Sequence, residues 1–266
     1  TQDGGRVYAD LYGKGDRGVV LAHGALFNKE SWAAQARPLA KAGFRVLAID
    51  FRGHGKSRGG PNTPRSLVGL SYDVLAAVRY LHETGSKDVS VVGASLGGGA
   101  SAQAATEAKP GEIDRLILLA AVAIKDPQKM QGRKLFIVSE HDMLGNGTPR
   151  LNVVREQYEQ APGPKKLLVL PGSAHAQNIF KTDQGPRLYH AIVWQLTAGD
   201  HAASMRVYDR VQARADQRTD LFELRDGIAE EMRRDPHIVY FGEGTGERGG
   251  TFGHTKGLWQ EFGPRR

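Results

Sequence analysis

The chain has 266 residues, a formal net charge of +7, a hydrophobic fraction of 40% and no cysteine. Its length is enough for one large α/β domain, or for one domain plus a small appendage, and its apolar content is ordinary for a globular protein with a core. The absence of cysteine excludes disulfides, a thiolate nucleophile and any zinc site with cysteine ligands.

Short apolar runs alternate along the chain with longer amphipathic stretches, a pattern typical of strands and helices that follow one another in turn. Continuous apolar strands indicate a parallel sheet covered on both faces, and the alternation predicts a mostly parallel, twisted α/β sheet with right-handed crossovers. The predicted strands are residues 18–22, 44–49, 89–92, 116–119, 135–138 and 167–170, with an antiparallel edge strand within 6–11. The predicted helices are residues 30–41, 71–81, 96–108, 150–160 and 186–196.

The pattern changes near residue 198, where we place the end of the main domain, residues 1–198. Residues 199–220 are predicted to form a linker, and a solvated helix is the alternative for the polar stretch 210–219. Residues 221–266 are predicted to form a small, incomplete α/β unit, with a helix, a short strand and a glycine-rich tail. The chain starts at Thr1 rather than at a methionine, which favours a piece of a longer protein.

A G-x-S-x-G pentapeptide, residues 93–97, stands between the predicted strand 89–92 and the helix that starts at Leu96. A serine on such a sharp strand-to-helix turn has a strained backbone, and side chains two residues away on either side would clash. The helix start also offers free N–H groups and a positive dipole end to a developing oxyanion. The motif predicts Ser95 as a nucleophile; the alternative is a tight turn in a nucleotide-binding or carrier fold.

An oxyanion hole needs two main-chain donors. One is expected to be the N–H of Leu96, directly after the nucleophile, and the other to come from the loop after an earlier strand. The segment His23-Gly24-Ala25 provides that loop, and we predict Ala25 N–H as the second donor and a structural role for His23. The alternative is an ordinary turn at a strand end.

The base and the acid of a serine triad are expected after the nucleophile, with the histidine last in the chain. His175 follows the last predicted strand and is therefore the predicted base. Asp142, which follows the strand 135–138, is the predicted acid that orients the imidazole. Glu140 on the same loop and Asp126 after the preceding strand are the alternatives, and a solvated turn is another explanation for Asp142.

Two glycine-containing segments look like phosphate-binding loops but lack essential parts. The turn at residues 50–57 ends like a P-loop, yet Asp50 stands where the first glycine is required, so we predict a structural turn held by Asp50 and Arg52. The G-x-G-x-x-G segment at residues 244–249 is not followed by a helical pattern. We therefore expect no cofactor, and we predict no metal site.

Residues from about 6 to 198 resemble the α/β-hydrolase family through pieces that occur in family order: His23-Gly24, the 50–57 turn, the 93–97 pentapeptide, Asp142 and His175. The resemblance implies an acyl-enzyme on Ser95, with His175 acting as base and then as acid. Ser139 departs from it, because many relatives have glycine there. Many relatives also insert a helical cap where this chain has only residues 122–133 between two strands, so we expect no cap domain and an open site.

Several short segments near the end of the chain match another family: residues 230–236, 242–243, 249–252, 255–258 and 262–263. Residues 224–265 resemble the start of the β subunit of thiamine-diphosphate-dependent 2-oxo acid dehydrogenases. The resemblance stops before the segment that, in that family, carries the glutamate acting on the cofactor, and Gly244 replaces a usual acidic residue. It implies a fusion or a truncated chain, and not a complete thiamine enzyme.

Together these motifs predict a serine hydrolase that cleaves a small-molecule carboxylic ester or thioester. The alternatives are an accessory module or subunit of a 2-oxo acid dehydrogenase, and a non-catalytic α/β-hydrolase scaffold. Scattered basic residues predict no nucleic-acid partner, and the longest clean apolar run, residues 116–124, is shorter than the roughly 20 residues of a membrane span. We expect a cytoplasmic protein, with residues 221–266 as the candidate contact for a protein partner.

Overall fold

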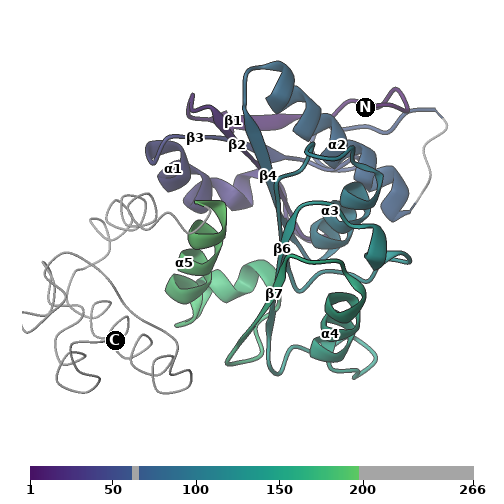
Figure 1. Ribbon diagram of the computed structural model, residues 1–266, viewed down its shortest axis with the longest axis vertical. Helices are drawn as coiled ribbons and strands as arrows, with labels where there is room; N and C mark the ends of the chain where they lie inside the picture. The colour runs from purple at the N-terminus through teal and green to yellow at the C-terminus, as the bar shows by residue number, and fades with distance from the viewer. Residues whose placement is uncertain (62–65, 198–266) are drawn as a thin grey trace, which may run out of the picture. The chain divides into compact units, whose positions relative to one another are not determined.

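The computed structural model describes residues 1–61 and 66–197 (Figure 1). The chain divides into two units, Thr1–Tyr208 and Asp209–Arg266, and every described residue belongs to the first unit. The predicted linker at residues 199–220 and the dehydrogenase-like segment at residues 221–266 lie outside the described residues, as does residue 198. The predicted domain boundary therefore stays a prediction.

Seven strands of the described region form one sheet, in the order β1-β3-β2-β4-β5-β6-β7. β1 pairs antiparallel with β3, and the other pairings in this sheet are parallel. This arrangement confirms the predicted mostly parallel sheet. The strands are β1 (Ala9–Tyr12), β2 (Arg17–Ala22), β3 (Phe44–Ile49), β4 (Asp88–Ala94), β5 (Arg115–Leu119), β6 (Arg133–Ser139) and β7 (Lys165–Leu170).

Helices cover both faces of this sheet, as predicted. Helices α1 and α5 lie on one side, and α2, α3 and α4 lie on the other (Figure 1). The α-helices are α1 (Ala33–Lys41), α2 (Leu67–Glu83), α3 (Leu96–Glu107), α4 (Arg150–Gln160) and α5 (Gly185–Leu196). Short 3₁₀ helices are η1 (Lys29–Trp32), η2 (Pro127–Lys129) and η3 (Ala176–Lys181).

The apolar core lies between the sheet and these two helical layers. In β5, Leu116, Ile117, Leu118 and Leu119 are all at most 1% exposed, which requires cover on both faces. This burial explains why the strand is a continuous apolar run instead of an alternating one. None of the described helices is both long enough and apolar enough to cross a lipid bilayer.

The predicted helix at residues 30–41 is two elements in the structure, η1 followed by α1. Asn28 has an extended backbone, and its side chain accepts a hydrogen bond from the N–H of Ser31 at 3.1 Å. This local bond stabilises a tight turn before the regular helix begins. Helix α2 starts at Leu67 rather than residue 71, because its packing against α3 and β2 outweighs the low helix propensity of Gly69.

The connection between β5 and β6, residues 120–132, contains only the 3₁₀ helix η2. This is the position at which a helical cap is predicted to be missing, and no such helical insertion stands there. The 50–57 turn is held by polar contacts: Asp50 accepts the Lys29 N–H at 2.8 Å, and the Arg52 guanidinium binds the carboxylates of Asp73 and Asp3 at 2.7 and 2.6 Å.

Candidate active site

Ser95 stands between β4 and α3, in a backbone conformation that side chains rarely adopt, with φ at +52° and ψ at −114°. The two glycines of the pentapeptide make this turn possible. A Cβ at Gly93 would lie 2.5 Å from the carbonyl oxygen of Gly97, and a Cβ at Gly97 would lie 2.4 Å from the carbonyl oxygen of His23. Strain of this kind is characteristic of functional positions, and here it presents the serine at the carboxyl end of the sheet.

Alanine at Gly97 is expected to destabilise the protein, because the new Cβ would press on main-chain atoms of Ala22 and His23 that cannot rotate away. We expect the free energy of unfolding to fall by about 1–3 kcal/mol, the usual cost of overpacking. Urea denaturation of the variant measures this change. Gly145→Ala is the control, since a Cβ at Gly145 meets nothing within 4 Å. Equal stability of the two variants would contradict the packing at the turn.

Three predicted residues from distant parts of the sequence are joined by two consecutive hydrogen bonds. His175 Nε2 lies 2.8 Å from Ser95 Oγ, and His175 Nδ1 lies 2.7 Å from Asp142 Oδ2. The carboxylate only accepts hydrogen bonds, so Nδ1 carries the proton and Nε2 is left to accept from the serine hydroxyl. Asp142 is 2% exposed, whereas the His175 side chain is 34% exposed. The histidine can therefore pass a proton from the serine to a molecule bound at the surface.

The two alternative acids lie elsewhere. Glu140 is exposed and pairs with its neighbour His141 at 4.0 Å, and Asp126 pairs with Lys129 at 3.4 Å. Neither has a hydrogen bond or ion pair with His175 in the described region. The geometry therefore favours Asp142 over both alternatives.

Sequence reasoning missed a cation that adjoins this acid. Arg150 is the first residue of α4, and its side-chain Nε lies 3.2 Å from Asp142 Oδ2. The main-chain N–H of Arg150 donates to the main-chain carbonyl of Asp142 at 2.9 Å. These two contacts tie the start of α4 to the loop that carries the predicted acid. The loop is further fixed by Ser139, the residue that replaces glycine, whose hydroxyl donates to the Ala174 carbonyl at 2.7 Å. No sequence motif signals either contact.

The loop after β2 lies against the serine turn. A Cβ at Gly24 would be 3.5 Å from Ser95 Cβ, so the Gly24–Ala25 peptide is next to the nucleophile. Leu96 is the first residue of α3, where a main-chain N–H has no acceptor within the helix. The structure thus brings both predicted oxyanion donors, Ala25 and Leu96, to the neighbourhood of Ser95.

His23 is fully buried beneath this loop. Its Nδ1 donates to the Gly24 carbonyl at 2.8 Å, and its Nε2 accepts the Phe51 N–H at 3.2 Å. Burial lowers the pKa of His23, so the ring is neutral near pH 7 and each nitrogen has one role. These contacts fit the structural role predicted for His23.

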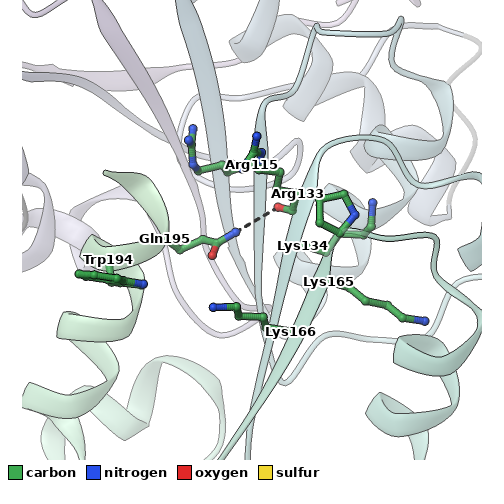
Figure 2. Close-up of a pocket in the computed structure, with 8 residues that line it drawn as sticks. Arg115, Arg133, Lys134, Lys165, Lys166, Trp194 and Gln195 are labelled. Atoms are coloured by element: carbon green, nitrogen blue, oxygen red, sulfur yellow. Dashed lines mark hydrogen bonds between the residues drawn. The ribbon is translucent and has the colours of Figure 1, made fainter. Parts of the chain in front are cut away.

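A hollow of about 330 Å³ lies away from these residues, at the amino ends of β5, β6 and β7 (Figure 2). Figure 2 shows Gln195 of α5 reaching the start of β6, where its amide donates to the Arg133 carbonyl at 3.4 Å. Ser95 lies at the carboxyl end of β4, so the hollow is not part of the candidate active site. Its basic lining residues are Arg115, Arg133, Lys134, Lys165 and Lys166.

Two known proteins are similar to different parts of the chain. It is 36% identical over 126 residues to the dihydrolipoyllysine-residue acetyltransferase component of the acetoin cleaving system of Cupriavidus necator. The aligned residues cover 47% of this chain and 32% of that protein. It is 51% identical over 47 residues to the pyruvate dehydrogenase E1 component subunit beta-3, chloroplastic, of Arabidopsis thaliana, covering 17% of this chain and 12% of that protein. The chain therefore spans less than half the length of either relative.

The architecture is shared with solved structures. The monoacylglycerol lipase of Paleococcus ferrophilus superposes with a TM-score of 0.61 at 18% identity, over 73% of this chain and 100% of that chain. At this identity the likeness shows the fold alone. A family model described as alpha/beta hydrolase fold matches residues 18–181, which is more than half of the chain. The chain therefore belongs to the α/β-hydrolase family.

Proposed function

We propose that the protein is a serine hydrolase that cleaves a carboxylic ester or thioester through an acyl-enzyme on Ser95. The observation that carries this proposal is the continuous chain of short hydrogen bonds from Ser95 through His175 to Asp142, set on a strained strand-to-helix turn. A nucleophile with a base within hydrogen-bond reach, itself oriented by a third group, is the arrangement needed for nucleophilic acyl transfer.

In the first half of the reaction, Ser95 Oγ attacks the carbonyl carbon of the substrate as its proton moves to His175 Nε2. The carbonyl electron pair moves to oxygen, where the N–H groups of Leu96 and Ala25 stabilise the charge. The buried carboxylate of Asp142 stabilises the imidazolium. Collapse of the intermediate breaks the bond to the leaving alcohol or thiol, which takes its proton from His175.

In the second half, a water molecule attacks the acyl-enzyme while His175 takes its proton. The same oxyanion donors stabilise the second tetrahedral intermediate, and its collapse releases the carboxylic acid and returns the proton to Ser95 Oγ. No step uses a cofactor or a metal.

Labelling with a fluorophosphonate probe tests whether the serine is reactive. We expect stoichiometric labelling of Ser95, blocked in Ser95→Ala and unaffected in Ser173→Ala, a serine exposed on the loop that carries His175. Absence of labelling in a folded protein would support a non-catalytic scaffold instead.

We expect a preference for short acyl chains, because the connection between β5 and β6 has no cap to bury a long apolar tail. In a covered tunnel each added methylene would contribute about 0.8 kcal/mol, or about fourfold in catalytic efficiency. A panel of p-nitrophenyl esters and acyl-CoA thioesters of graded length measures this dependence. A steady rise in kcat/KM out to the palmitoyl ester would contradict an open site.

The second candidate function is an accessory module of a 2-oxo acid dehydrogenase. It is favoured by the two relatives, one named for a dihydrolipoyllysine acetyltransferase component and the other for a dehydrogenase β subunit. For this role we propose S-acetyldihydrolipoamide, a thioester, as an additional substrate to test. Hydrolysis no faster than that of acetyl-CoA would argue against this role, as would a parent reading frame that contains no dehydrogenase unit.

A further inference from the structure

Gln177 is a buried polar residue that the proposed chemistry does not use directly. It is 5% exposed and lies on η3, two residues after His175. Its Oε1 accepts the N–H of Gly24 at 2.8 Å, and its Nε2 donates to Ser31 Oγ at 3.0 Å. One side chain therefore connects the segment that carries the base with the loop that carries the Ala25 N–H.

The orientation of this amide follows from its partners. The Gly24 N–H can only donate, so it must meet the oxygen of the Gln177 side chain. Ser31 Oγ donates its own hydrogen to the Asn28 carbonyl at 2.5 Å, which leaves the hydroxyl oxygen free to accept from Nε2. Each group therefore has a defined role, and the buried amide is bonded at both ends.

The bond to the Gly24 N–H is one of several that hold the main chain at and beside the Gly24–Ala25 peptide. The Gly24 carbonyl accepts from His23 Nδ1 at 2.8 Å and from the Phe27 N–H at 3.0 Å. The Ala25 carbonyl accepts from His54 Nε2 at 3.1 Å. Gln177 holds the amide on the amino side of Gly24, which no other described residue contacts through a hydrogen bond. The Gly24 carbonyl shares one planar peptide with the Ala25 N–H, so the bonds to that carbonyl orient the N–H directly. The bonds at the Gly24 N–H and the Ala25 carbonyl hold the two adjoining peptides and so restrict how that plane can turn.

The backbone around Gln177 supports a specific placement. Ala176, between His175 and Gln177, is buried and has φ at +48°, a conformation that residues other than glycine rarely adopt. This turn directs Gln177 inward while His175 faces Ser95. Strain held at such a position indicates that the surrounding contacts determine it.

We propose that Gln177 is a positioning residue for the oxyanion hole. It holds the His23–Gly24 peptide and so restricts the next peptide to an orientation in which the Ala25 N–H meets the oxygen of the tetrahedral intermediate, and it links this donor to the base two residues away. The inference rests on the proposed serine hydrolase function. It predicts that Gln177 matters for the transition state and much less for substrate binding, because the negative charge develops only as the bond to Ser95 forms.

The test compares Gln177→Ala and Gln177→Met with Asn178→Ala in the full chain, using p-nitrophenyl acetate. Methionine keeps the length of the side chain and fills the buried space, but it provides no amide. Asn178 is an exposed amide on the same 3₁₀ helix, so it is the matched control. We expect kcat to fall by about tenfold to a hundredfold in both Gln177 variants, somewhat less than the loss of a whole oxyanion donor, with KM within about twofold. Asn178→Ala should match the wild type.

A second readout is the binding of a trifluoromethyl ketone, which forms a tetrahedral adduct with serine. We expect its affinity to fall in both Gln177 variants by the same factor as kcat/KM, since transition-state analogues depend on the oxyanion donors. Thermal melting identifies any variant that fails to fold. If Gln177→Ala unfolds, the other two variants test the inference. Gln177→Met removes the acceptor of the Gly24 N–H, and Ser31→Ala removes the hydroxyl that supports the other end of the amide; neither leaves a large cavity in the core.

Ser95→Ala, measured in parallel, distinguishes a failure of the inference about Gln177 from a failure of the proposed function. If Ser95→Ala abolishes activity while folded Gln177 variants behave like Asn178→Ala, the inference is wrong and the proposed function stands. A rise in KM at unchanged kcat would also overturn it, because that result assigns Gln177 to substrate binding. If Ser95→Ala retains wild-type activity, the proposed function fails and the inference fails with it.

Discussion

Replacing Ser95 with alanine is expected to lower kcat for p-nitrophenyl acetate by about a million-fold, as loss of a serine nucleophile does where the triad acts as a unit. The hydroxyl is the attacking atom, and alanine has no group that can form the acyl-enzyme. The fold should persist, because among the described residues the side chain forms one hydrogen bond, to His175. The turn itself is held by main-chain bonds from Ser95 to Leu119 and from Val122 and Gly99 to Ser95.

The measurement combines steady-state kinetics with thermal melting. Ser173→Ala is the matched control, since it removes an exposed hydroxyl from the loop that carries His175 without touching the hydrogen-bonded chain. We expect that control to match the wild type in both assays. Retention of more than a tenth of wild-type activity by a folded Ser95→Ala variant would show that the nucleophile is assigned wrongly.

The second large effect is expected for Asp142→Asn, with a loss of about ten-thousand-fold in kcat, the size found for the equivalent change in a serine protease. The carboxylate accepts the hydrogen bond from His175 Nδ1 at 2.7 Å and so keeps the proton off Nε2. An amide can present its N–H to Nδ1 instead, which places the proton on Nε2 and prevents that nitrogen from accepting the serine hydrogen. The charge that stabilises the imidazolium is lost as well.

The two alternative carboxylates provide the controls. Glu140→Gln and Asp126→Asn change side chains that pair with His141 and Lys129 rather than with the base. We expect both to keep activity within about threefold of the wild type, since exposed ion pairs contribute little. If Glu140→Gln were the most damaging of the three, the acid would have to be reassigned to the neighbouring position.

Much of the fold follows from local pattern. The strand β3 and the helix α4 have the predicted bounds. In each case the sequence pattern itself shows both ends: a short apolar run between turns for β3, and an uninterrupted helical stretch of 11 residues for α4. Boundaries were missed where a side chain or a packing surface competes with propensity. The capping Asn28 separates η1 from α1, and the buried face of α2 extends the helix through Gly69. These contacts involve residues that are near in space, and the local sequence does not identify them.

Part of the site also follows from the sequence, because the serine turn is a local structure. The steric need for glycine at positions 93 and 97 arises within five residues, so the pentapeptide alone predicts it. The position of His175 follows from chain order and from its place after the last strand. Three carboxylates at strand ends were compatible with the same order, however, and pattern alone could not choose among them.

The choice of acid, and the contacts of Arg150 and Gln177, depended on the path of each loop in space. Gln177 and Gly24 are 153 residues apart, and β4, β5 and β6 stand between β2 and β7 in the sheet; their hydrogen bond exists because the segment after β7 extends along the sheet to the loop after β2. A buried amide has no periodicity and no motif that would reveal its partner in the sequence. Local sterics therefore determine the turn and its nucleophile, whereas long-range packing determines which polar groups surround them.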